Sequence, residues 1–174
     1  MSQLLSNDTI TLRALEPTDL DMLYQWENDT ALWVVSDTIA PYSRKALWQY
    51  LQEDTGDIYA QRQLRLIITL TSNGTAVGTV DFLNFDPLNN RAELGLFITK
   101  EMRGKGLGRQ SLEAITAYAR DHIGLKQLYV YISTDNCVCL HLFEQFGYRQ
   151  VGVIQSWVKR GHNYQDVTLL QMLL

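Results

Sequence analysis

The residues best suited to chemistry form one short run, Arg103–Arg109, in which glycine alternates with basic and apolar residues. Glycine lets the backbone turn tightly and approach a ligand with no Cβ in the way. A helix that begins in such a run exposes unpaired N–H groups and a partial positive charge. The side chains of Arg103, Lys105 and Arg109 add formal positive charge. The run therefore predicts a cradle for a pyrophosphate.

Two familiar phosphate-binding motifs fit this run poorly. A P-loop requires Gly-Lys followed by Ser or Thr, whereas Lys105 is followed by Gly106. A dinucleotide-binding fingerprint requires a different glycine spacing, with an acidic residue about 20 positions later at the end of a second parallel strand. The strand predicted before the run instead closes a hairpin meander. A third kind of phosphate loop and a purely structural glycine-rich turn are the remaining interpretations.

Hydrophobic periodicity places the run between a strand and a helix. Alternation predicts a strand over Arg91–Thr99, and the apolar residues after the run recur at helical spacing until Gly124 ends the helix. Upstream, the strands Leu64–Thr71 and Thr75–Phe85 flank Asn73-Gly74, a hairpin signal that requires positive φ at both turn residues. These strands predict an antiparallel meander that leads into the run.

The other segments alternate between strands and helices. Pro17 opens one helix and Ser43 caps another, with an irregular aromatic stretch, Ala31–Tyr42, between them. Further strands are predicted at residues 9–15, 127–133, 148–154 and 167–173, and a further helix ends at Gly147. This order predicts a mixed α/β (α+β) fold in a single domain over residues 1–174.

Composition limits the class of protein. The chain has 174 residues, of which 46% are hydrophobic and 20% charged. This content is enough for one buried core and excludes a disordered chain. No apolar run reaches the roughly 20 residues of a membrane span, and the first residues do not resemble an export signal. Two cysteines, Cys137 and Cys139, predict neither a disulfide framework nor a metal site, so a cytoplasmic location is expected.

Charge is distributed unevenly along the chain. Residues 1–60 contain ten acidic and three basic residues, whereas residues 61–174 contain twelve basic and nine acidic ones. The formal net charge of −4 argues against nucleic-acid binding, which needs a basic surface. The asymmetry is consistent with an anionic ligand on the C-terminal part and a cationic one near the N-terminal part, or simply with a solvated acidic surface.

Several motifs together resemble the GNAT superfamily of N-acetyltransferases. The pattern Arg103-x-x-Gly106-x-Gly108 is similar to its acetyl-coenzyme A loop. Asn136, followed seven residues later by Phe143 and then by Phe146-Gly147-Tyr148, resembles its second coenzyme A segment. The segments Thr11-Leu12-Arg13, Gly78-Thr79-Val80-Asp81 and Arg91-Ala92-Glu93-Leu94-Gly95 look like the subgroup of spermidine and ribosomal-protein N-terminal acetyltransferases. The resemblance covers about residues 9–174.

The resemblance implies a mostly antiparallel sheet that splays at the acetyl-CoA site, with helices on both faces. It implies acetyl transfer from acetyl-CoA to a primary amine in a ternary complex, with a polyamine-like small molecule favoured, no metal, and a possible homodimer. A protein N-terminus is the alternative acceptor, and a catalytically silent coenzyme A-binding protein or an assembly protein is the alternative class. The residues it implies for acetyl-CoA are Leu96, Phe97, Ile98, Arg103, Gly104, Lys105, Gly106, Leu107, Gly108, Arg109, Asn136 and Phe143.

The resemblance also suggests catalytic residues. Glu93 is the favoured general base and Asp81 the second candidate, and the two acids converge only if strand register allows it. Many relatives carry a tyrosine where this chain has Phe143, and that tyrosine is thought to protonate the leaving thiolate. Tyr131 is a candidate for that role here, with Ser133, Tyr148 or a water as alternatives.

Overall fold

The computed structural model describes residues 4–36 and 38–174. The chain divides into two compact units, one made of Met1–Ala14 with Asp57–Leu174 and the other of Leu15–Gly56. Within the described residues, no helix has the length and apolar character that a membrane crossing requires.

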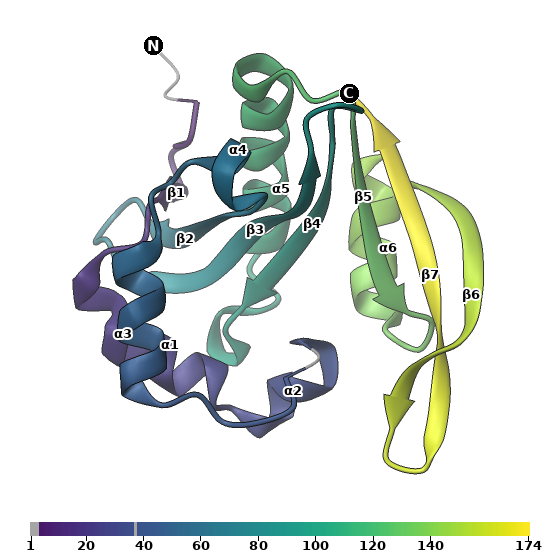
Figure 1. The fold of residues 1–174 in the computed structure, drawn as a ribbon. Helices are drawn as coiled ribbons and strands as arrows, with labels where there is room; N and C mark the ends of the chain where they lie inside the picture. The colour runs from purple at the N-terminus through teal and green to yellow at the C-terminus, as the bar shows by residue number, and fades with distance from the viewer. Residues whose placement is uncertain (1–3, 37) are drawn as a thin grey trace. The chain divides into compact units, whose positions relative to one another are not determined.

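The larger unit contains a seven-stranded sheet with the order β1-β2-β3-β4-β5-β7-β6. Its strands are β1 (Ile10–Arg13), β2 (Leu64–Leu70), β3 (Ala76–Asp86), β4 (Arg91–Ile98), β5 (Gln127–Ser133), β6 (Arg149–Arg160) and β7 (Asn163–Leu173). Neighbouring strands are antiparallel except β4 and β5, which are parallel. A parallel neighbour needs a crossover connection, and a helix supplies it here (Figure 1). The predicted mixed α/β fold is confirmed.

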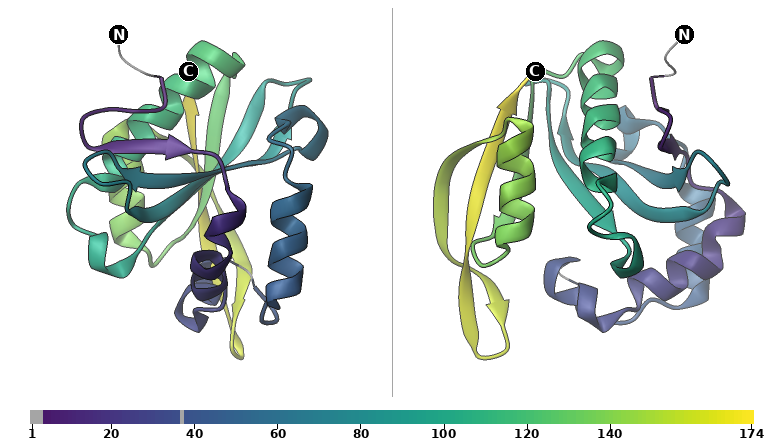
Figure 2. Two further views of the ribbon diagram at one scale, coloured as in Figure 1. Left: turned by 90° about the vertical axis from the view of Figure 1, so that its left-hand side faces the viewer. Right: turned by 180° about the vertical axis from the view of Figure 1, so that it is seen from behind.

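Two helices cover one face of this sheet. α5 (Leu107–Tyr118) continues into a π-helical turn, η3 (Ala119–Ile123), and ends at Gly124 as predicted. α6 (Cys137–Phe146) follows β5. Both helices lie on the same side of the sheet when it is seen from behind (Figure 2, right). Their apolar residues join the strands in one buried cluster that includes Val80, Phe82, Leu94, Leu112, Ile115, Leu128 and Phe143.

The sheet opens between β4 and β5. The two strands pair only over Arg91–Glu93, opposite Gln127–Tyr129. Beyond that point β4 stays paired with β3 up to Ile98, while β5 stays paired with β7 up to Ser133. The strands therefore diverge, and Figure 1 shows the gap widening toward their C-terminal ends. The splay implied by the sequence resemblance is present.

β3 and β4 approach each other unusually closely at Gly78. A Cβ placed on this residue would overlap the carbonyl oxygen of Phe97 on β4. No other residue type fits there without moving the backbone of β4, because the obstacle is a backbone atom and not a flexible side chain. Gly78 thus lets β3 pack closely against β4, the strand that borders the gap.

We expect Gly78→Ala to lower the free energy of unfolding by about 3 kcal/mol, because an overlap with backbone cannot relax by a rotamer change. Urea denaturation measures the loss. Gly95→Ala is the matched control on the neighbouring strand, since its Cβ would meet Asp81 at an ordinary 3.4 Å. Equal losses for the two variants would contradict the close approach.

The turn between β2 and β3 differs from the prediction. Gly74 has a φ of 73°, but Asn73 is not among the described residues with positive φ. The loop is longer than a two-residue turn, because Leu70 N–H donates to the Thr75 carbonyl at 2.9 Å. The side chain of Asn73 instead accepts from Thr75 N–H at 3.0 Å, so an asparagine turn does what left-handed backbone was expected to do.

The sequence prediction also misplaced several ends in the larger unit. A short helix, α4 (Ile58–Gln61), was not predicted, and its cap is the Asp57 carboxylate, which accepts from the N–H groups of Tyr59 and Ala60. The strands β6 and β7 run much further than expected, to either side of the Gly161 turn.

The smaller unit is helical. It contains η1 (Pro17–Asp19), a 3₁₀ turn, followed by α1 (Leu20–Glu27), α2 (Thr30–Ser36) and α3 (Arg44–Glu53). The predicted cap is confirmed, since Ser43 Oγ accepts from Ala46 N–H at 3.1 Å. Leu23, Leu47 and Leu51 form its buried cluster. The prediction of an irregular stretch at Ala31–Tyr42 is wrong in its first part, because α2 lies there. The side chain of Asp29 supports the first turn of α2 by accepting from Ala31 N–H.

Candidate active site

The glycine-rich run forms a turn between a 3₁₀ turn, η2 (Lys100–Met102), and α5. Gly106 is the N-cap of α5 with a φ of 77°, and no side chain caps this helix. The N–H groups of the first turn, those of Leu107, Gly108 and Arg109, have no acceptor earlier in the helix. They are the donors that a pyrophosphate would use.

The two kinds of glycine in this run serve different purposes. Gly104 and Gly106 adopt positive φ, and a Cβ added at either would meet nothing within 4 Å, so the space beside the backbone is open. Gly108 is packed: its Cβ would lie 3.1 Å from Leu142 on α6 and 3.7 Å from Leu96 on β4. The open space at Gly104 and Gly106 is suited to a ligand, and the packing of Gly108 against α6 and β4 fixes the position of the turn.

Three exposed cations surround this helix start. Arg103 donates from Nε to the Ile98 carbonyl at 3.0 Å, which ties the loop back to the end of β4. Lys105 lies against the Met102 sulfur at 3.4 Å, and Arg109 pairs with Glu113 one turn further along α5 at 3.2 Å. Backbone donors, open glycines and positive charge together fit the diphosphate of a nucleotide such as coenzyme A.

The phase of β4 decides which backbone groups face the gap. Thr99 N–H donates to the Val77 carbonyl on β3 at 2.9 Å. In an antiparallel ladder every second residue faces the same neighbour, so Phe97 turns its backbone toward β3. Leu96 and Ile98 turn theirs toward β5, which no longer pairs with β4 at this level in the described chain. Two of the three predicted residues therefore present backbone groups to the gap.

Glu93 is the last residue of β4 that pairs with β5, at the point where the gap begins. Its Oε2 accepts a hydrogen bond from Asn84 Nδ2 at 2.7 Å. Its neighbour in the β5 register is Tyr129, whose pKa is raised first by burial and then by the negative charge of Glu93. The ring of Tyr131 lies 5.7 Å from that of Tyr129, edge to face, and 41% of Tyr131 is exposed. An acid and two tyrosines thus share one sheet face.

The register places Asp81 on the same face. Asp81 is opposite Gly95 and Leu83 is opposite Glu93, so the two acids are diagonal neighbours. The strand register therefore allows Asp81 and Glu93 to share a face, as their convergence required. Asp81 is buried and pairs with Arg65 Nε at 2.6 Å, and it also accepts from the Thr79 hydroxyl at 3.3 Å.

We expect Asp81→Asn to lower the free energy of unfolding by about 3 kcal/mol, because it removes one partner from a mostly buried ion pair. Chemical denaturation measures this. Glu113→Gln is the matched control, since it breaks the exposed Arg109–Glu113 pair and should cost less than about 0.5 kcal/mol. A loss of that small size for Asp81→Asn would show that the Arg65 pair does not stabilise the fold.

The second predicted coenzyme A segment lies on α6. Asn136 is its N-cap and accepts from Cys139 N–H at 3.2 Å. Phe143 lies in the core, 1% exposed, and its ring meets Tyr148 edge to face at 5.0 Å. A ligand contact by Phe143 stays a prediction, since this structure leaves almost none of its surface open.

The alternative proton donors differ in their surroundings. Burial raises the pKa of Tyr148 far above its usual value, and its hydroxyl is fully buried with no hydrogen-bond partner among the described residues. Cys139 is not one of these candidates, and burial raises the pKa of its thiol to about 11, so that the thiol stays protonated and inert. Tyr131 is exposed, whereas Ser133 is half-buried.

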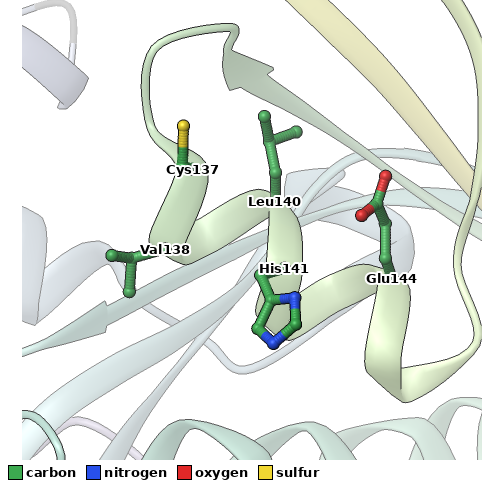
Figure 3. A pocket seen from close by; sticks show the side chains of 5 residues that line it. All are labelled: Cys137, Val138, Leu140, His141 and Glu144. Carbon is green, nitrogen blue, oxygen red and sulfur yellow. The ribbon is translucent and has the colours of Figure 1, made fainter.

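A pocket also lies along α6. It is lined by Cys137, Val138, Leu140, His141 and Glu144, all from one helix. Figure 3 shows that the five side chains fan out in different directions and do not converge on a point. No group of three metal-ligating side chains occurs in the described part of the chain, and the expectation of no metal stays a prediction.

Sequence reasoning missed two residues of the site. Tyr129 was identifiable in principle, because it precedes Tyr131 by two positions and so shares its face of the strand. Asn84 gave no signal, because it lies inside a segment predicted as regular strand, whereas its φ is 48°.

Comparison with known proteins agrees with this geometry. Residues 9–149 match the family model described as "Acetyltransferase (GNAT) domain". The spermidine N(1)-acetyltransferase of Vibrio cholerae is 24% identical over 171 residues, which cover 96% of this chain and 94% of that protein. The protein named "Putative ribosomal N-acetyltransferase YdaF" of Bacillus subtilis is 24% identical over 182 residues, covering 96% and 92%.

Among solved structures, spermidine N-acetyltransferase from Vibrio cholerae in complex with CoA and spermine has a TM-score of 0.86 at 24% identity, with 96% of each chain covered. This likeness establishes the fold. The family model spans most of the chain, including β4, the glycine-rich turn and α5. The chain therefore belongs to the GNAT family of N-acetyltransferases.

Proposed function

We propose that this protein transfers an acetyl group from acetyl-CoA to a primary amine, with a polyamine-like small molecule as the acceptor. The observation that carries the proposal is the arrangement along β4. Glu93 stands where β4 and β5 part, the backbone of Leu96 and Ile98 faces the gap, and the glycine-rich turn follows directly. One strand thus links a base, a free strand edge and an anion cradle.

The chain's own residues suit the cosubstrate. The first-turn N–H groups of α5, with Arg103, Lys105 and Arg109, would hold the diphosphate of acetyl-CoA. The backbone groups of Leu96 and the N–H of Ile98 would pair with the amide-containing arm, as a strand edge pairs with any extended chain, while the Ile98 carbonyl accepts from Arg103 Nε. When bound, acetyl-CoA supplies the thioester carbonyl that the amine attacks.

Proton removal is the step in which the chain must assist. A primary alkylamine has a pKa of about 10.4, so at neutral pH nearly all of it is protonated and not nucleophilic. Glu93 is a half-buried carboxylate at the point where the gap begins, and it is the residue proposed to take that proton, directly or through a water. Asp81 is the weaker candidate, because its carboxylate is held by Arg65.

Protonation of the released thiolate is assigned to Tyr131. The residue that many relatives use is replaced by Phe143, and Tyr148 is sealed in the core. Tyr131 is exposed and lies on the same sheet face as Glu93. Because coenzyme A thiolate is a fair leaving group, we expect Tyr131 to contribute less than Glu93.

Two observations bear on the acceptor. The V. cholerae relative is named for spermidine, and its solved complex contains spermine, which supports a polyamine. The B. subtilis relative is named for a ribosomal substrate, which supports a protein N-terminus as the second candidate. The possible homodimer stays a prediction; one structural neighbour, another form of the V. cholerae enzyme, is described as dodecameric.

A panel of amines tests the proposal. The purified protein is incubated with acetyl-CoA and spermidine, spermine, an amino acid or a peptide that carries a ribosomal-protein N-terminus, and free thiol is measured together with the mass of the product. We expect acetylated polyamine to form fastest. Faster acetylation of the peptide would favour the second candidate, and coenzyme A binding without any thiol release would replace the enzyme by a silent binding protein.

A further inference from the structure

β3 contains an irregularity next to Glu93. Leu83 pairs with Glu93, but the next pair is Asp86 with Arg91, so β3 has one residue more than β4 over this stretch. The extra residue makes a β-bulge at Asn84 and Phe85, and Asn84 has a φ of 48°. Bulges bend a strand locally and redirect a side chain.

The bulge is held in place from the side of the core. Phe85 is 4% exposed, its N–H donates to the Arg62 carbonyl at 2.9 Å, and its ring meets Tyr59 edge to face at 5.1 Å. In regular strand, Asn84 would point to the face opposite that of Leu83 and Glu93. With the bulge, its amide reaches the carboxylate of Glu93 at 2.7 Å.

The residue type at this position suits the task. Asparagine is among the few non-glycine residues that tolerate left-handed backbone, and its amide donates without adding charge. A lysine or arginine there would form an ion pair with the carboxylate instead. Asn84 is itself exposed, so its hydrogen bond contributes little to the stability of the fold. Its main effect is on the direction of the Glu93 carboxylate.

We propose that Asn84 is a positioning residue, which fixes Oε2 of Glu93 so that Oε1 is directed to the amine. This inference rests on the proposed function, in which Glu93 is the base. A base must lie within hydrogen-bond reach of the proton that it takes, and a carboxylate free to rotate spends less time there.

Asn84→Gly separates positioning from stability. Glycine adopts the left-handed backbone more readily than asparagine, so the melting temperature should stay the same or rise. Without the amide, kcat for acetyl transfer should fall by about tenfold while the KM for the amine changes less than about twofold. Asn90→Gly is the matched control, because Asn90 has a φ of 49° and lies in the turn between β3 and β4; its kcat should not change.

A double-mutant cycle with Glu93→Gln completes the test. If Asn84 acts through Glu93, Asn84→Gly should lower kcat no further in the Glu93→Gln background. An unchanged kcat for Asn84→Gly alone, or an equal loss in both backgrounds, would overturn the inference while leaving Glu93 as the base. An unchanged kcat for Glu93→Gln alone would overturn the base assignment, and this inference with it.

Discussion

Gly106→Trp should abolish measurable binding of coenzyme A while leaving the protein folded. Gly106 is the N-cap of α5, and the space where its side chain would project is open. An indole there would occupy the position from which a diphosphate reaches the first-turn N–H groups. Three charge-assisted hydrogen bonds of about 1.5 kcal/mol each would be lost. This loss weakens the affinity for coenzyme A by a factor of about a thousand or more.

Calorimetric titration with coenzyme A measures the effect. The matched control is Gly124→Trp, since Gly124 has a φ of 79°, equally open space, and a place at the opposite end of the same helix. Both substitutions force a side chain into left-handed backbone and should cost similar stability. If both variants bind coenzyme A like the parent protein, the glycine-rich turn is a structural turn and not a cradle.

Local features of the fold were predictable because each depends on a few neighbouring residues. Gly124 ends η3, the continuation of α5, and Ser43 caps α3 as expected, since a helix stop and a helix cap need only one suitable residue in one position. The prediction of left-handed backbone at Asn73 was wrong for an equally local reason. Asparagine has two ways to make a turn, by left-handed backbone or by its side chain, and the sequence does not distinguish them.

Features of the site that depend on register were not predictable. Whether Glu93 and Asp81 share a face depends on how β3 aligns with β4, and a slip of one residue would separate them. The partner of Asp81 is Arg65, on a strand 16 residues earlier, which no local pattern indicates. The glycine-rich turn was predictable because it is contiguous in sequence, whereas Glu93, Tyr129 and Asn84 come from three different strands.

Glu93→Gln should lower kcat for a polyamine acceptor by about a thousandfold, in the middle of the range for loss of a general base. Glutamine keeps the size of the side chain and can still accept from Asn84, so the fold and the KM for acetyl-CoA should change little. Steady-state kinetics measures both parameters. Glu144→Gln, an exposed acid on α6, is the control and should leave kcat unchanged.

The acceptor itself provides the sharper form of this test. An amine whose pKa lies below the assay pH arrives without the extra proton, so it needs less help from a base than an alkylamine with a pKa of about 10.4. The ratio of parent to Glu93→Gln rates should therefore shrink as the pKa of the acceptor amine falls. If the ratio is large and the same for strongly and weakly basic amines, Glu93 binds or orients the acceptor and another group takes the proton.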